Sequence, residues 1–127
     1  MNGGDDWFVR DIAHHVDLAG PGVYAWRIDG VVVYVGKASR LRSRLREYRN
    51  NIGKIGDGRP YRRGEPGGFR RVHRALAEAR AAGRAVVFSV IEGCPRGDAL
   101  LARERHWIAE LAPALNGRLR PAGGGEA

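Results

Sequence analysis

The chain has 127 residues, of which 43% are hydrophobic. This length fits one domain with a modest core, and the ordinary hydrophobic content argues against a wholly disordered chain. The 22 Lys and Arg residues outnumber the 14 Asp and Glu residues, and the net charge of +8 favours a polyanionic partner, most commonly nucleic acid. No apolar run approaches the roughly 20 residues that cross a bilayer, so we expect no membrane partner.

The excess positive charge is concentrated in one third of the chain. Residues 37–71 contain 12 Lys and Arg residues and 3 Asp and Glu residues, whereas the rest of the chain is close to neutral. Cys94 is the only cysteine, which excludes an intrachain disulfide and favours a reducing compartment. Because the first residues also lack the pattern of a secretion signal, we expect an intracellular, cytoplasmic protein.

The first predicted elements are a short helix and a β-hairpin. Apolar residues recur at roughly helical spacing over residues 7–16, which predicts a helix within an N-terminal extension, residues 1–19. Residues 22–28 and 31–36 are rich in Val, Ile, Tyr and Trp. They flank Asp29-Gly30, a dipeptide that strongly favours a hairpin turn.

The hairpin leaves two registers open. A two-residue turn pairs Ile28 with Val31 and directs Tyr24 and Tyr34 to opposite faces of the sheet. A type I turn followed by a G1 bulge pairs Arg27 with Val31 instead and brings both tyrosines to one face. Propensity does not choose between them, but a shared active site would favour the bulged register.

Three helices and one strand are predicted after the hairpin. Ser39 is expected to cap a helix over residues 40–49, and a second helix is expected over residues 69–83. The apolar run at residues 85–91 predicts a buried strand. Residues 95–111 predict the last helix.

The order of these elements predicts the fold class. Residues 20–117 are expected to form one small α/β (α+β) domain, with a three-stranded, mainly antiparallel sheet flanked by helices. Residues 50–67 are rich in Gly, Pro and basic side chains and predict a flexible loop. The Gly-rich residues 118–127 predict a flexible tail.

Two charged residues share the apolar faces of their predicted helices. Arg44 lies four residues before Tyr48, and we expect its inward guanidinium to bind an anion such as phosphate. Glu104 lies four residues from both Leu100 and Ile108. A carboxylate on such a face is unfavourable unless it binds a cation or forms a salt bridge, for which Arg44 is a candidate partner. The helix pattern alone favours neither alternative.

Several short motifs occur together in one order and spacing. The chain thereby resembles the GIY-YIG nuclease family, at Gly22-Val23-Tyr24, Tyr34-Val35-Gly36-Lys37-Ala38, Leu41, Arg44, Tyr48, Glu104 and Asn116. Both triplets carry Val where the family name has Ile. The similarity spans residues 20–117, and its hairpin-to-helix block looks particularly like the N-terminal incision domain of the bacterial excision-repair nuclease.

The resemblance implies metal-dependent hydrolysis of a DNA phosphodiester. Glu104 would be the only protein ligand of one Mg²⁺ or Mn²⁺ ion. Arg44 would stabilise the charge on the phosphate. One tyrosine, with Tyr34 favoured, would take a proton from the attacking water, and Tyr24 and Tyr48 would position the water and the phosphate.

Other positions would support this site. Lys37 and Arg44 would supply the positive field that favours the phenolate of Tyr34. The resemblance implies that the Asn116 side chain forms structural hydrogen bonds that hold the C-terminal segment against the site. Gly36 is also expected to have a structural role near the site. His73 lies at the inner edge of its predicted helix, where a packed core histidine is favoured over a role beside the phosphate.

DNA is the expected partner. The basic loop at residues 50–67 would grip it, and phosphate contacts are expected from Arg40, Arg42, Arg46, Arg49, Lys54, Arg59, Arg62, Arg63, Arg70 and Arg71. Cutting both strands with one active site would require dimerisation or two visits, and a homodimer or a partner protein on the DNA is one expected arrangement. The alternative function is a nucleic-acid-binding module that has kept this scaffold without catalysis.

Overall fold

The computed structural model describes residues 7–60 and 69–116 of the chain. Four strands and three α-helices occur in these residues, followed by one turn of 3-10 helix. In chain order they are β1 Val9–Asp11, β2 Gly22–Ile28, β3 Val31–Ala38, α1 Leu41–Gly56, α2 Arg71–Ala81, β4 Val86–Gly93, α3 Asp98–Leu111 and the 3-10 turn Ala114–Asn116.

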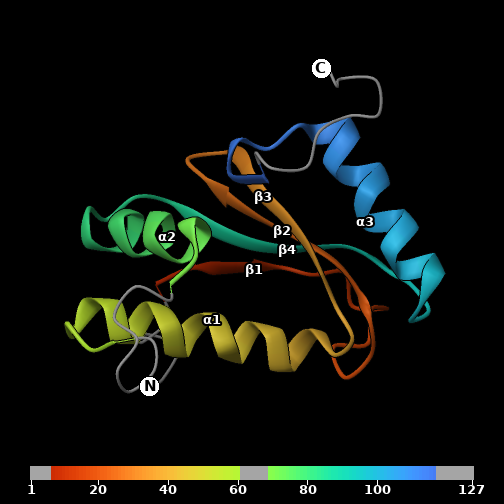
Figure 1. Ribbon diagram of the computed structural model, residues 1–127, viewed down its shortest axis with the longest axis horizontal. Helices are drawn as coiled ribbons and strands as arrows, with labels where there is room; N and C mark the ends of the chain where they lie inside the picture. The colour runs from red at the N-terminus through yellow and green to blue at the C-terminus, as the bar shows by residue number, and fades with distance from the viewer. Residues whose placement is uncertain (1–6, 61–68, 117–127) are drawn as a thin grey trace.

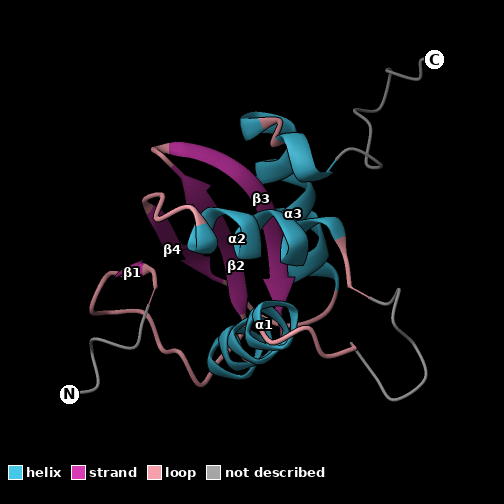
Figure 2. Cartoon of the chain, turned by 90° about the vertical axis from the view of Figure 1, so that its left-hand side faces the viewer, coloured by secondary structure: helices cyan, strands magenta, loops and turns pink. Residues whose placement is uncertain are grey.

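The strands form one mixed sheet in the order β1-β4-β2-β3 (Figure 2). Strand β2 is antiparallel to both β3 and β4, whereas β1 is parallel to β4. The α+β class is confirmed, but the prediction of three strands was wrong, because β1 adds a parallel fourth strand to the free edge of β4.

Helices cover both faces of the sheet (Figure 1). On one face, Tyr24, Trp26 and Phe88 pack with the apolar residues of α1 and α2. On the other face, Val23 and Val35 pack with the apolar residues of α3. Because successive residues of β2 alternate between the faces, its apolar side chains are divided between these two cores.

The predicted helix over residues 7–16 was wrong. Instead, Trp7 stacks on Trp26 with ring centroids 5.8 Å apart, and the edge of Phe8 meets the same ring at 5.4 Å. The chain then enters β1 and pairs with β4. A few apolar residues cannot distinguish a helix from an edge strand, and here backbone pairing with β4 and packing on Trp26 determine the structure.

The hairpin combines features of both predicted registers. Ile28 pairs with Val31 across a two-residue turn whose central residues both have positive φ, as a type I′ turn requires. The register then shifts at Val33, so that Trp26 lies opposite Tyr34. This bulge in β3 brings Tyr34 to the face that carries Tyr24 and Trp26. The tyrosines therefore share one face, although the bulge does not lie at the turn.

The start of α1 is fixed by backbone contacts. Ser39 was expected to cap this helix, but Arg40 holds the cap position, and its side chain makes no capping hydrogen bond. The first two helical amides instead donate to the carbonyl oxygens of Gly20 and Leu18, at 2.9 and 2.7 Å. The segment just before β2 thus holds α1 in place against the hairpin.

Helix α1 is longer than expected. It continues past residue 49 to Gly56, because Ile52 is fully buried and this end of the helix packs against α2. The expected loop over residues 50–67 is therefore helical in its first part, and residues 61–68 lie outside the described part of the chain. Helix α2 and strand β4 lie close to their predicted positions, and α3 begins at Asp98, three residues later than expected.

Two glycines are required by close packing. A Cβ atom at Gly22 would lie 2.7 Å from the carbonyl oxygen of Glu92. A Cβ atom at Gly36 would lie 2.5 Å from the hydroxyl oxygen of Tyr24. Both glycines are therefore required because another chain segment occupies the space of a side chain.

We expect Gly36→Ala to destabilise the fold by about 1–3 kcal/mol, because the added methyl group would displace the ring of Tyr24. Gly53→Ala, in α1, is the matched control, since its Cβ would meet nothing within 4 Å and should stabilise the helix by roughly 0.5–1 kcal/mol. Denaturant unfolding measures both changes. Equal stability of the two variants would contradict this packing argument.

Candidate active site

Three tyrosines form the centre of the candidate site. The hydroxyl oxygens of Tyr24 and Tyr48 lie 2.7 Å apart in a hydrogen bond, and both side chains are fully buried. Tyr34 is half-buried, with its ring centroid 6.4 Å from that of Tyr24. The hairpin therefore contributes two phenols and α1 contributes the third.

The buried phenols are held neutral. Burial raises the pKa of Tyr24 well above its ordinary value, and the neighbouring Tyr48 and Tyr34 raise it further. Burial likewise raises the pKa of Tyr48. Neither side chain can therefore supply a phenolate near neutral pH, and Tyr34 is the phenol of this cluster closest to solvent.

Arg44 projects from α1 on the side that carries Tyr48. Its Nε is buried and has no hydrogen-bond partner among the described residues. Its Nη1 donates to the carboxylate of Glu47 at 2.9 Å. Arg44 is therefore paired with its own helix and not with Glu104, although part of its guanidinium remains without a partner.

Glu104 reaches the same region from α3. That helix packs on the opposite face of the sheet, but the Glu104 carboxylate extends to the edge strand β3 and accepts a hydrogen bond from the backbone amide of Lys37. Burial raises the pKa of Glu104, while the charges of Lys37, Arg105 and Arg44 oppose this shift. Within residues 7–60 and 69–116, no cation forms an ion pair with Glu104.

Asn116 fixes the middle of β3. Its side-chain amide accepts a hydrogen bond from the backbone N–H of Val35 and donates one to the carbonyl oxygen of Val35, both at 2.9 Å. The segment after α3 is thereby attached to the strand that carries Tyr34. Lys37, two residues further along, is exposed, and its charge acts on Glu104.

His73 is buried next to the tyrosines. Its Nδ1 accepts a hydrogen bond from the backbone N–H of Arg70 at 3.2 Å, and its ring centroid lies 5.4 Å from that of Tyr48. Burial, together with the charges of Arg70 and Arg44, lowers the pKa of His73 to about 4. The imidazole is therefore neutral near neutral pH, where it holds the start of α2 against the cluster.

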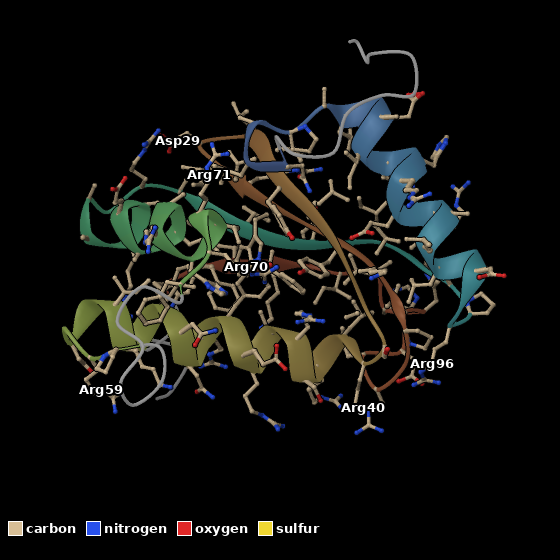
Figure 3. The ribbon with its side chains drawn as sticks, viewed as in Figure 1. Asp29, Arg40, Arg59, Arg70, Arg71 and Arg96 are labelled. Atoms are coloured by element: carbon tan, nitrogen blue, oxygen red, sulfur yellow. The ribbon has the colours of Figure 1, made fainter. Side chains whose placement is uncertain are left out.

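Arg70, one of the predicted DNA contacts, lies against the tyrosines. Its Nη1 donates to the hydroxyl oxygen of Tyr34 at 3.3 Å. Its guanidinium carbon lies 5.9 Å from the ring centroid of Tyr34 and 6.0 Å from that of Tyr48. Figure 3 shows Arg70 between α1 and α2. The one sequence signal for this position is its place three residues before the buried His73, at the start of α2.

The other predicted DNA contacts lie on different surfaces. Arg42, Arg46 and Arg49, together with Arg10, line a hollow of about 480 Å³ beside α1. Arg40 and Arg59 lie at opposite ends of α1 (Figure 3). The remaining predicted contacts are Lys54 near the end of α1, Arg71 at the start of α2, and Arg62 and Arg63, which lie outside the described residues.

Metal binding would depend on one side chain. In the described part of the chain, no three His, Cys, Asp or Glu side chains gather closely enough to hold a metal ion together. Glu104 is half-buried, lacks an ion-pair partner there and lies beside the backbone of β3. A single carboxylate of this kind suits Mg²⁺, which keeps several of its own water ligands.

Comparison with known proteins finds similarity for the segment that forms the hairpin and α1. The family model for a UvrC-like GIY-YIG domain matches residues 20–57. The resemblance to the GIY-YIG family is thereby confirmed over residues 20–57, and its expected continuation to residue 117 stays a prediction. Within this chain, 29 residues are 66% identical to UvrABC system protein C of Gemmatimonas aurantiaca, and the aligned segment covers 22% of this chain and 5% of that protein. No solved structure matches the chain.

The GIY-YIG match covers part of the candidate site. Tyr24, Tyr34, Lys37, Arg44 and Tyr48 lie inside residues 20–57, and their roles remain predictions. The residues contributed by α2, α3 and the 3-10 turn lie outside the match.

None of the described helices has the length and apolar character needed to cross a bilayer.

The raised pKa of Glu104 predicts a pH-dependent stability. Because its pKa is higher in the folded than in the unfolded chain, ionisation of this carboxyl destabilises the fold. The destabilisation is absent below the ordinary carboxyl pKa and complete above the folded-state pKa. Glu104→Gln, which stays neutral, should therefore raise the free energy of unfolding near neutral pH, and the gain should disappear at acid pH.

Thermal unfolding without divalent ions, measured across this pH range, tests this effect. Glu110→Gln is the matched control, because Glu110 is exposed on the same helix and its replacement should give no comparable gain. A gain from Glu104→Gln that persists unchanged at acid pH would contradict the assignment to ionisation.

Proposed function

We propose that this chain is a DNA endonuclease that hydrolyses phosphodiester bonds with one Mg²⁺ or Mn²⁺ ion bound to Glu104. One observation carries the proposal: a half-buried carboxylate, without an ion pair among the described residues, lies at the edge of β3 within electrostatic range of Arg44. The similarity of residues 20–57 to a UvrC-like GIY-YIG domain supports the nuclease class.

The charges around the Glu104 carboxylate suit a phosphate substrate. When bound, the metal ion would supply positive charge opposite the scissile phosphate and the departing oxygen. Lys37 and Arg44 would add positive charge near the same point, since both already act on the carboxylate. The substrate would be DNA, because the surrounding residues 37–71 hold most of the excess positive charge of the chain.

Arg44 would bind the phosphate through the part of its guanidinium that Glu47 leaves without a partner. The buried Nε has no acceptor among the described residues, and a phosphate oxygen would provide one. The contact with Glu47 would keep the guanidinium in position before substrate arrives. Arg44 is therefore expected to act mainly on the charge that develops in the transition state.

Tyr34 would accept the proton of the attacking water. The other two phenols of the cluster are held neutral by burial, and their mutual hydrogen bond keeps them in place. Tyr34 is the phenol with access to solvent. Tyr24 and Tyr48 would therefore form a rigid support that positions the reacting groups, and Asn116 would hold the strand that carries the base.

The proposal extends to the compartment, the number of copies on the DNA and the biological role. A chain with a single cysteine fits a reducing, cytoplasmic compartment. Cutting both strands would require a second copy of the chain, a partner protein on the DNA or a second visit by the same active site, since we propose one active site in each chain. A role in DNA repair is proposed from the similarity to UvrABC system protein C.

Cleavage of supercoiled plasmid tests the proposal. The protein should nick plasmid with Mg²⁺ and not with EDTA, and Glu104→Ala or Arg44→Ala should lower the rate by about 100-fold or more while the chain stays folded. Glu110→Ala, on an exposed position of α3, is the control and should cleave normally. Nicking by Glu104→Ala at the wild-type rate would overturn the proposal.

Metal binding can be tested without cleavage. Mg²⁺ should raise the melting temperature of the wild-type protein and have little effect on Glu104→Gln, because a ligand stabilises only the state that binds it. An equal shift in both proteins would exclude Glu104 as the ligand.

A gel retention experiment tests the alternative function. Retention of duplex DNA in a gel, with no cleavage under any divalent ion, would favour a binding module without catalysis.

A further inference from the structure

We propose that Arg70 is a positioning residue that holds the hydroxyl of Tyr34 and favours its phenolate. The inference rests on the proposed nuclease function, in which Tyr34 is the base. It assigns a chemical role to the N-cap residue of α2, which lies outside the GIY-YIG match at residues 20–57.

The first argument is contact geometry. The Arg70 guanidinium donates a hydrogen bond to the Tyr34 hydroxyl at 3.3 Å and lies near the faces of both Tyr34 and Tyr48. A cation that donates to a phenol oxygen stabilises the ionised form more than the neutral form. No other described cation is hydrogen-bonded to this hydroxyl.

The second argument is the position of Lys37. This lysine was expected to favour the phenolate of Tyr34, but it pairs with Val23 of β2, whose side chain packs on the α3 face of the sheet. The Lys37 charge acts on Glu104 on that side. Tyr34 lies on the other face, so the nearby cation from α2 is better placed to act on it.

The third argument is that the charge of Arg70 is available and its backbone is fixed. Among residues 7–60 and 69–116, no carboxylate forms an ion pair with Arg70. Its backbone N–H donates to His73 and its carbonyl oxygen accepts from Arg74, so the start of α2 is held by two hydrogen bonds. The guanidinium is exposed enough to meet substrate while it stays beside the phenol.

In the reaction, Arg70 would act before and during proton transfer. The Tyr34 hydroxyl first loses its proton to solvent, and the neighbouring guanidinium stabilises the resulting phenolate. The phenolate oxygen then takes a proton from water as the water oxygen forms its bond to phosphorus. The bond from phosphorus to the departing oxygen breaks, and that oxygen is protonated by solvent.

Spectroscopic titration tests this inference without any cleavage. The tyrosinate absorbance of the wild type minus that of Tyr34→Phe isolates the ionisation of this phenol. In an Arg70→Gln background, the same difference titration should move to higher pH by about 1–2 units, and Arg70→Lys should restore part of this shift. Arg74→Gln, one turn further along α2, removes a charge of the same sign and should not shift the pH of the Tyr34 difference titration.

The pH dependence of plasmid nicking gives the second readout. Arg70→Gln should lower the rate near neutral pH by about 10- to 100-fold, with the loss shrinking as the pH rises. A Tyr34 titration that does not move in Arg70→Gln would overturn the inference, and so would weaker DNA binding with an unchanged pH profile. If Glu104→Ala cleaves normally while the titration still moves, the nuclease mechanism fails but the effect of Arg70 on Tyr34 stands.

Discussion

The absence of a side chain at one position of β3 determines how the site is built. The ring and hydroxyl of Tyr24 occupy the space where a Cβ atom of Gly36 would stand. This close approach places the Tyr24 hydroxyl within hydrogen-bond distance of Tyr48 on α1. The hairpin and the helix are thus joined at the centre of the phenol cluster. Tyr34 and His73 pack beside these two tyrosines, and Arg70 donates a hydrogen bond to Tyr34.

The edge position of β3 explains how helices on opposite faces of the sheet can serve one site. If β3 were a central strand, a further strand beside it would block the path of a side chain from α3 to the phenols on the other face. At the edge, Glu104 reaches the backbone of Lys37 from one face, while Arg44 and Arg70 approach the phenols from the other. The acid and the arginines therefore stay on separate helices, where each is held by a different hydrophobic core.

Local patterns predicted the hairpin, α2, β4 and α3, and motif spacing predicted five candidate site residues in the hairpin and α1. What they missed depends on tertiary contacts. Strand β1 depends on pairing with the edge of β4, and the bulge in β3 lies at Val33, away from the turn. Arg70 meets the tyrosines because α2 packs against α1. The pairing of Arg44 with Glu47 was overlooked although it lies within one helical turn.

The amide of Asn116 has a consequence for the sheet as a whole. By bonding both the N–H and the carbonyl oxygen of Val35, it occupies the hydrogen-bonding groups that an incoming strand would use at the middle of β3. An incoming strand could therefore not pair with β3 at Val35 unless the side chain of Asn116 moved away. The same border, free of a competing strand, stays accessible to the carboxylate of Glu104.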